Sequence, residues 1–463
     1  MSSHAWTHPA AWIAVAILIF GVAPRLAAGP ARLLEPLPSG RPLSANALAA
    51  GADNFDARGP AWMQGRSPGN PGERVLFRQR VRLNAAVLKT GEPIELEVEG
   101  KKYTLHRVDE YTRPGGETYF YSTDPIGPDG EGGVLSTFTT FDDGRPFWSS
   151  LSLDGKSYEL SPEGDHYVLK RALYPRIREA ERMFAPREPR EPVARVQAMS
   201  FEPGFTPMAS DAQWSVTATR RRACCTWWNR IPFVVVVNVG AKNPYGITDK
   251  AKVEARVAYY FDLMNAALRN SGETNFVYYR EIAYLSFPDS VPDNGYYNWA
   301  KDDPGVEEVR ARNKAAASVL LLGRFVQHQA SMLSPAPYMV KPSYRIAIAG
   351  GYLRDDSKVD ALTTAHEMGH VLGKDHEYKW SQAALTGVPD LFPKRIGWSS
   401  CERMQHCIMA YGDCNGVTGG GMETVEIFSG YRAMKLGYPV DPEVQNSVLI
   451  SGQVGRELAR DWP

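Results

Sequence analysis

The stretch HEMGHVLGKDH, residues 366–376, holds three of the nine histidines of this 463-residue chain. His366 and His370 are four positions apart, so on a helix their side chains lie on one face, one turn from each other. Gly373 can adopt the left-handed backbone conformation that ends a helix and turns the chain. Such a turn would bring His376 back towards the other two rings as a third nitrogen ligand.

This spacing predicts an open zinc site. Structural zinc sites have four protein ligands, whereas three protein ligands leave one position for water and are typical of catalytic sites. Glu367 would project beside the histidine face, where its carboxylate can reach that water without binding the metal. We therefore expect one catalytic Zn²⁺ ion. The alternative, three unrelated histidines in a core helix, is disfavoured because the glycine and the third histidine also stand at fixed offsets.

A second motif, CIMAYG at residues 407–412, lies downstream of the first. With both motifs the chain resembles the metzincin clan of zinc endopeptidases, which joins H-E-x-x-H-x-x-G-x-x-H to a methionine turn beneath the zinc. The matching residues are the ligands His366, His370 and His376, the general base Glu367 and the turn methionine Met409. The resemblance implies a peptidase; an ordinary buried methionine is the alternative for Met409 alone.

The branch of the clan is less clearly marked. The Cys-Ile-Met triplet is most similar to the reprolysin (adamalysin-like) branch. Tyr411 instead resembles a tyrosine of astacins and serralysins, which approaches the zinc and stabilises the oxyanion; a packing role is its alternative. Glu377 departs from the many reprolysins that carry aspartate after the third histidine.

Residues 223–463 are expected to form the metzincin-like zinc peptidase domain. Strands are predicted at 233–239, 276–285, 319–326 and 344–349, and helices at 248–268, 304–317, 358–372 and 444–460. This order predicts a mixed, mostly parallel sheet with flanking helices. The resemblance implies that one of these is a long zinc-binding helix, and that a small C-terminal subdomain contains the methionine turn and a C-terminal helix. The resemblance adds an antiparallel edge strand that pairs with extended substrate.

The segment 74–172 has a different pattern. Short runs alternate apolar and polar residues, and turn signals such as Asp143-Gly144 and Asp154-Gly155 separate them. They predict an antiparallel β-sandwich or barrel-like prodomain. An irregular segment, 29–73, precedes it, and a linker rich in proline and charge, 173–222, follows. The expected fold class is therefore α+β/α-β, with a β-rich prodomain followed by the catalytic domain.

The N-terminus predicts export. The apolar run at 10–23 is short for a membrane span, and small residues follow it, so residues 1–28 read as a signal peptide. The protein would be secreted, extracellular or periplasmic, with no stable membrane association after cleavage. An uncleaved anchor is the alternative, because no lysine or arginine precedes the apolar run. The formal net charge of zero gives no reason to expect a nucleic-acid partner.

All five cysteines, Cys224, Cys225, Cys401, Cys407 and Cys414, lie in the second half of the chain. In an oxidising compartment they could form disulfides, and an odd count leaves one thiol free or intermolecular. Because adjacent cysteines fit disulfide geometry poorly, we expect Cys224 or Cys225 to reach the 401–414 cluster. Zinc ligation by these cysteines is disfavoured, since no C-x-x-C pair exists.

The order of signal, β-rich segment, linker and peptidase resembles a secreted zymogen. Arg220-Arg221-Arg222 reads equally as a processing site or as solvated charge. No cysteine precedes Cys224, so latency would not place a cysteine on zinc. Glu163-Gly164-Asp165 is similar to the aspartate motif of astacin propeptides, but Pro162 replaces the aromatic residue and a hairpin turn is the favoured alternative.

The expected function is hydrolysis of peptide bonds in protein or peptide substrates. Glu367 would accept a proton from a zinc-activated water and deliver it to the departing amine, with Tyr411 assisting at the oxyanion. A secreted zinc-containing binding or adhesion protein with little or no peptidase activity is the alternative. Such a protein can lose the glutamate and keep its metal, but Glu367 is intact. A zinc hydrolase acting on other bonds also stays open.

Overall fold

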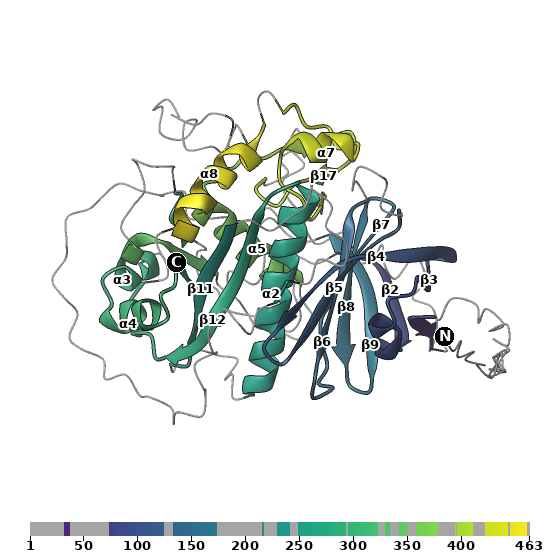
Figure 1. Ribbon diagram of the computed structural model, residues 1–463, viewed down its shortest axis with the longest axis horizontal. Coiled ribbons are helices and arrows are strands. Elements are labelled where there is room, and N and C mark those ends of the chain that lie inside the picture. The colour runs from purple at the N-terminus through teal and green to yellow at the C-terminus, as the bar shows by residue number, and fades with distance from the viewer. Residues whose placement is uncertain are drawn as a thin grey trace, which may run out of the picture.

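The computed structural model describes residues 32–37, 74–124, 133–173, 215–216, 229–240, 249–292, 295–322, 329–333, 342–349, 358–377, 394, 396–410, 422–442 and 445–460. Two large sheets, a small three-stranded sheet and the helices around them make up this part of the chain (Figure 1). The apolar run at 10–23 lies outside it. No helix within the described ranges has both the length and the apolar character needed to cross a membrane.

Hairpins build the N-terminal region into one sheet of ten strands. Each strand from β3 to β9 pairs antiparallel with the next along the chain. Tight turns between them use left-handed glycines, for example Gly155 with φ +71° and Gly164 with φ +63°. The strands are β1 (Leu34–Pro36), β2 (Arg74–Leu83), β3 (Ile94–Val98), β4 (Lys101–Arg113), β5 (Gly116–Ser122), β6 (Leu135–Phe141), β7 (Ser149–Leu153), β8 (Lys156–Glu163), β9 (His166–Leu173) and β10 (Ser215–Val216).

The ends of this sheet approach each other, so the sheet is nearly closed. At one end β2 pairs with β9, and β1 pairs with β2. Arg32, just before β1, forms a bridge with Glu95 of β3, and the Leu33 N–H donates to the Glu95 carbonyl at 3.0 Å. Closure satisfies backbone groups that an open edge would expose.

The second sheet has five strands in the order β12-β11-β13-β15-β14. Its members are β11 (Asn229–Asn238), β12 (Asn275–Leu285), β13 (Ala317–Leu321), β14 (Gln329–Ala330) and β15 (Ile346–Ala349). Four of them run parallel, and β14 lies antiparallel to β15 at the edge. A smaller sheet contains β16 (Ser399–Ser400), β17 (Gln405–His406) and β18 (Glu423–Thr424).

Helices cover both faces of the five-stranded sheet. They are α2 (Lys250–Asn270), α3 (Tyr296–Ala300), α4 (Pro304–Arg312) and α5 (Lys358–Val371), with α7 (Tyr431–Lys435) and α8 (Ser447–Arg460) nearer the C-terminus. Successive side chains of β11 alternate between faces: Val234 and Val236 pack with α3 and α4, whereas Val235 and Val237 join the core that contains α2 and α5. In Figure 1, α2 lies between the two large sheets.

Buried polar contacts join the ten-stranded sheet to these helices. The Asp262 carboxylate of α2 accepts a hydrogen bond from the Thr118 hydroxyl at 2.9 Å and further bonds from Tyr111 and Thr139. Burial raises the pKa of Asp262. These hydroxyls come from β4, β5 and β6, so the sheet supplies the partners that a buried carboxyl requires.

A second buried contact lies at the start of α5. Lys358 forms an ion pair with Glu426, and both side chains are almost fully buried. Lys358 also donates to the Ser150 hydroxyl at 2.8 Å, and the Ser157 hydroxyl donates to Glu426 at 2.8 Å. Ser150 and Ser157 belong to β7 and β8, so the ten-stranded sheet contacts the helix that carries the histidine motif.

The structure corrects the expected fold class. We expected a mixed, mostly parallel sheet with a long zinc-binding helix to characterise the fold, but the largest sheet is the nearly closed antiparallel one. The mixed sheet has half as many strands, and α5, with 14 residues, is shorter than α2, with 21. Neighbouring hairpins extended one sheet continuously, because each added strand satisfies the edge of the previous one. The domain boundaries at residues 28, 73, 172 and 222 stay predictions.

Candidate metal centre

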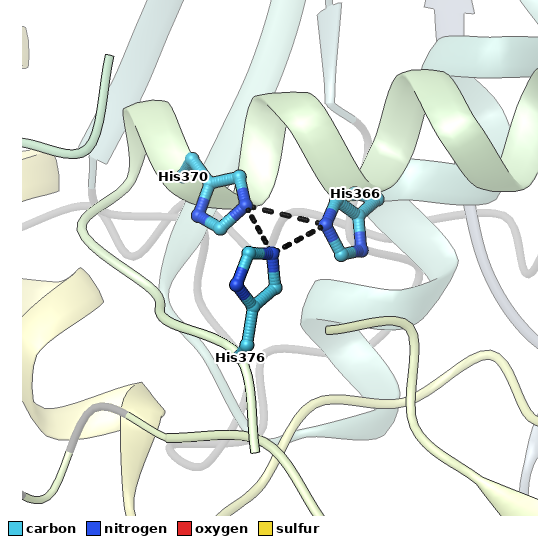
Figure 2. A group of neighbouring side chains, drawn as sticks. All are labelled: His366, His370 and His376. Atoms are coloured by element: carbon cyan, nitrogen blue, oxygen red, sulfur yellow. Dashed lines mark hydrogen bonds between the residues drawn. The ribbon is translucent and has the colours of Figure 1, made fainter. Parts of the chain in front are cut away.

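Three histidine rings converge at the end of α5 (Figure 2). His366 and His370 lie one turn apart on the helix, and His376 follows the turn after it. The Nε2 atoms of His366 and His370 are 3.2 Å apart, those of His366 and His376 3.2 Å, and those of His370 and His376 3.1 Å. All three residues are buried. The residues selected by spacing in the sequence therefore meet in space.

The turn towards His376 depends on Gly373. Its φ of +82° lies in the left-handed region, which strongly favours glycine. A Cβ at this position would lie 2.9 Å from the Leu333 carbonyl oxygen and 2.9 Å from a methyl group of Val454. Neither the backbone conformation nor the space admits a side chain, so Gly373 ends the helix as the sequence predicts.

Hydrogen bonds determine which nitrogen carries the proton in two of the rings. Nδ1 of His366 donates to the Ile408 carbonyl at 2.7 Å, and Nδ1 of His370 donates to the Lys374 carbonyl at 2.7 Å. Because a carbonyl oxygen can only accept, both Nδ1 atoms are protonated, and in the neutral rings Nε2 carries the lone pair. This is the tautomer of a metal-binding histidine whose second nitrogen is held by a carbonyl.

The three nitrogens fit a zinc ion. Lone pairs that face each other at these distances repel unless a cation lies among them. Two nitrogen ligands at about 2.0–2.1 Å from zinc, at a tetrahedral angle, are about 3.3–3.4 Å apart. The observed separations of 3.1–3.2 Å come close to this value. Three imidazoles are also a ligand set that zinc prefers.

Glu367 lies on the same helix, directly after His366, and its side chain is fully buried. A carboxylate at this position is a potential proton acceptor beside the three histidines. Successive residues of an α-helix are related by a constant rotation about the helix axis. The backbone of α5 therefore fixes the direction in which Glu367 leaves the helix relative to His366 and His370.

The segment 407–410 packs directly against the histidine helix. The Ile408 carbonyl contacts His366. The Met409 sulfur lies so close to Gly369 that a Cβ added to this glycine would be only 2.5 Å from it. Gly369 thus allows the methionine to approach the backbone of α5 closely. Met409 is fully buried. Tyr411, the next predicted residue of this segment, lies outside the described residues.

Sequence reasoning missed an ion pair behind the histidines. Lys374, between Gly373 and His376, is fully buried and pairs with Glu273, just beyond α2. Burial lowers the pKa of the Lys374 ammonium, and the neighbouring Glu273 carboxylate opposes this shift. The sequence did contain one indication of this ion pair, which is a lysine between residues that must be buried. No local pattern identifies its partner, which lies 101 positions earlier.

The described cysteines behave differently from each other. Cys407 is a free, buried thiol, and burial raises its pKa to about 12. Its sulfur accepts a hydrogen bond from the Trp398 N–H at 3.2 Å. Cys401 is disulfide-bonded. Cys224, Cys225 and Cys414 lie outside the described residues, so the disulfide connectivity stays a prediction.

Asp165, the residue compared with the aspartate of astacin propeptides, is not part of the group formed by His366, His370 and His376. It belongs to the turn between β8 and β9, where Glu163 pairs with His166, and its side chain is 96% exposed. Its carboxylate contacts His166 at 3.0 Å. The hairpin alternative is therefore confirmed. The arginines at 220–222 lie outside the described residues.

Comparisons with known proteins find likeness in structure alone. No protein-family model matches the chain, and no curated protein matches it in sequence. A chain from "Structure of a chaperone-substrate complex" is 13% identical, with a TM-score of 0.38, over 55% of this chain and 37% of that one. Metalloproteinase-II from Bacteroides fragilis is 12% identical, with a TM-score of 0.32, over 63% of this chain and 84% of that one. At TM-scores this low, neither likeness supports an argument about fold or activity.

Proposed function

We propose that this protein is a zinc-dependent hydrolase of peptide bonds. The proposal is carried by the convergence of three Nε2 atoms, from His366, His370 and His376, with Glu367 on the same helix. Three nitrogen ligands are typical of catalytic zinc sites, which keep one position for water or substrate. A closed structural site would need a fourth protein ligand, and among the described residues no further histidine, cysteine or carboxylate joins the group.

Each residue would have a separate task. Zinc, when bound, supplies a nucleophilic water at neutral pH and polarises a carbonyl oxygen. His366 and His370 present their lone pairs because the Ile408 and Lys374 carbonyls hold their Nδ1 protons. Glu367 accepts a proton from the attacking water and later delivers it to the departing amine.

The sheet edge beside α5 favours a peptide substrate. β14 is the outermost strand, and no other strand in the described part of the chain pairs with its outer side. Leu333, shortly after β14, donates its N–H to the His370 carbonyl at 3.1 Å, so this edge leads towards the histidines. An extended peptide can add to such an edge through backbone hydrogen bonds. We therefore propose an extended segment of a protein as the substrate.

Export and synthesis as a zymogen are part of this proposal and rest on the sequence. The segment 1–28 would direct the chain out of the cytoplasm, and 74–172 would be the prosegment. Cutting the linker 173–222 would leave in place the contacts of Ser150 and Ser157 with the buried ion pair at α5. Activation would then require separation of the two halves as well as cleavage.

The proposal is tested with the purified protein and an unstructured substrate such as casein. We expect one zinc ion per chain by elemental analysis, and cleavage that a zinc chelator abolishes. Added zinc should restore cleavage, and magnesium, which prefers oxygen ligands, should not. If the protein binds zinc stoichiometrically but cleaves neither casein nor a peptide library, before or after linker cleavage, the peptidase is excluded, and the binding or adhesion protein or a zinc hydrolase of other bonds replaces it.

A further inference from the structure

Lys374 connects the two parts of the histidine motif. Its backbone lies on the turn between His370 and His376, and its N–H donates to the Gly369 carbonyl at 3.0 Å. Its own carbonyl accepts the Nδ1 proton of His370 at 2.7 Å. The backbone position of this one residue therefore determines how the His370 ring is oriented and where the chain starts towards His376.

The side chain of Lys374 is held at a fixed point. Its ammonium pairs with Glu273 and lies 4.2 Å from the centre of the Phe428 ring. The other Glu273 oxygen accepts hydrogen bonds from Asn275 at 3.1 Å and from the Ser451 hydroxyl. Glu273 follows α2, Asn275 begins β12, and Ser451 lies on α8. Three elements of the fold thus converge on the carboxylate that binds Lys374.

We propose that the Lys374–Glu273 ion pair is a positioning element of the metal centre. It fixes the turn between His370 and His376 against α2, β12 and α8, so that both rings are held ready for the ion. This inference deepens the proposed function and rests on it only for the assignment of the three histidines to a metal. A buried pair adds little net stability compared with apolar residues of similar size, but it imposes a defined geometry.

The test uses the variant K374M/E273Q, which removes both charges, keeps similar volumes and leaves an acceptor for Asn275 and Ser451. The matched control is K358M/E426Q, which treats another buried lysine–glutamate pair, at the opposite end of α5, in the same way. Zinc dissociation constants are measured by competition with a chromophoric chelator, and the cobalt-substituted proteins are compared by their visible spectra.

We expect K374M/E273Q to bind zinc about 10–100-fold more weakly than the native chain, the range typical of lost outer-shell partners, and to change the cobalt spectrum. The control should stay within about threefold of the native affinity. The proposal is overturned if K374M/E273Q keeps the native affinity, or if the control loses as much. Failure of the native chain to bind zinc would instead contradict the proposed function.

A milder variant covers the case in which K374M/E273Q does not fold. S451A removes one donor to Glu273 and leaves the ion pair itself in place. We expect its zinc affinity to fall severalfold while K374R, which retains the positive charge, stays near the native value. Unchanged affinity in S451A would then overturn the proposal.

Discussion

The two large sheets contribute different chemistry to the interior of the molecule. The ten-stranded sheet directs hydroxyl groups, such as those of Thr118 and Ser150, towards the helices that cover the five-stranded sheet. The half built on the five-stranded sheet contributes charged groups, including Asp262 on α2 and Lys358 on α5. Within the described ranges, the only group able to hold a metal also belongs to that half. The half built on the five-stranded sheet thus carries the candidate centre, and hydroxyls of the ten-stranded sheet are partners for its buried Asp262 and Lys358. The ten-stranded sheet also contains a buried ion pair of its own, Lys170 with Glu159.

This division separates two kinds of substitution. A change at the histidine motif should alter chemistry with little effect on folding, because the reacting groups do not hold the sheets together. A change where the halves meet should alter stability, because an unpartnered buried charge is costly.

The largest effect is expected for E367Q. Glutamine has nearly the same volume as glutamate, but it cannot accept and deliver a proton, so peptidase activity should fall about 10²–10⁴-fold. Zinc content and the unfolding temperature should stay close to native. Activity is measured on a fluorogenic peptide. Undiminished cleavage by E367Q would show that another group is the base.

The next effect is expected where the halves meet. K358M leaves the Glu426 carboxylate buried without its cation, which should lower the free energy of unfolding by about 3–5 kcal/mol. The control is R145M, because Arg145 pairs with Asp143 and Glu254 at a partly exposed position. R145M should cost no more than about 1 kcal/mol. Denaturant titrations of both variants decide the matter; equal losses would remove the distinction between buried and peripheral contacts.

A smaller, pH-dependent effect is expected at His406 in β17. Burial lowers its pKa from 6.5 to about 4. Above pH 6.5 the imidazole is neutral in the folded and unfolded chain alike. Between pH 6.5 and about 4 the unfolded chain binds a proton that the folded chain does not, so stability falls as the pH falls, by up to about 3 kcal/mol. Below about pH 4 this residue causes no further loss.

The variant H406Q should remove this part of the pH dependence. Glutamine can still donate and accept hydrogen bonds near Thr424, whose hydroxyl lies 3.1 Å from His406 Nε2. Unfolding is measured by denaturant at pH 7, 5.5 and 4.5 with a chelator present, so that metal release does not contribute. If the native chain and H406Q lose the same stability between pH 7 and 4.5, the assignment of a low pKa to His406 is wrong.

Local patterns predicted that His366, His370 and His376 would meet, whereas zinc and the role of Glu367 stay predictions. The spacing of His366, His370 and Gly373 depends only on helix geometry and on one left-handed residue, both of which a sequence records. The carbonyl partners of the rings could not be read in the same way. Ile408 and Lys374 contribute backbone oxygens, which carry no residue-specific signal.

Tertiary pairing overruled local preference in two places. The helix expected over 304–317 ends at Arg312, because Ala317 pairs with Phe233 of β11 and the alanines before it lead into β13. The segment 29–73, expected to be irregular, contains β1, which pairs with β2. The pairs β2–β9 and β4–β10 join strands far apart in sequence, which leave no local trace, so the closure of the antiparallel sheet could not be predicted.

The buried thiol of Cys407 has a consequence for oxidative folding. A cysteine attacks a disulfide only as the thiolate. With a pKa near 12, the Cys407 sulfur stays protonated at neutral pH. Thiol exchange would therefore bypass it once the chain is folded. Of the five cysteines, setting aside this one leaves four, an even number that can pair completely. This free thiol, which is therefore a poor nucleophile at neutral pH, lies in the interior beside the methionine of the candidate centre.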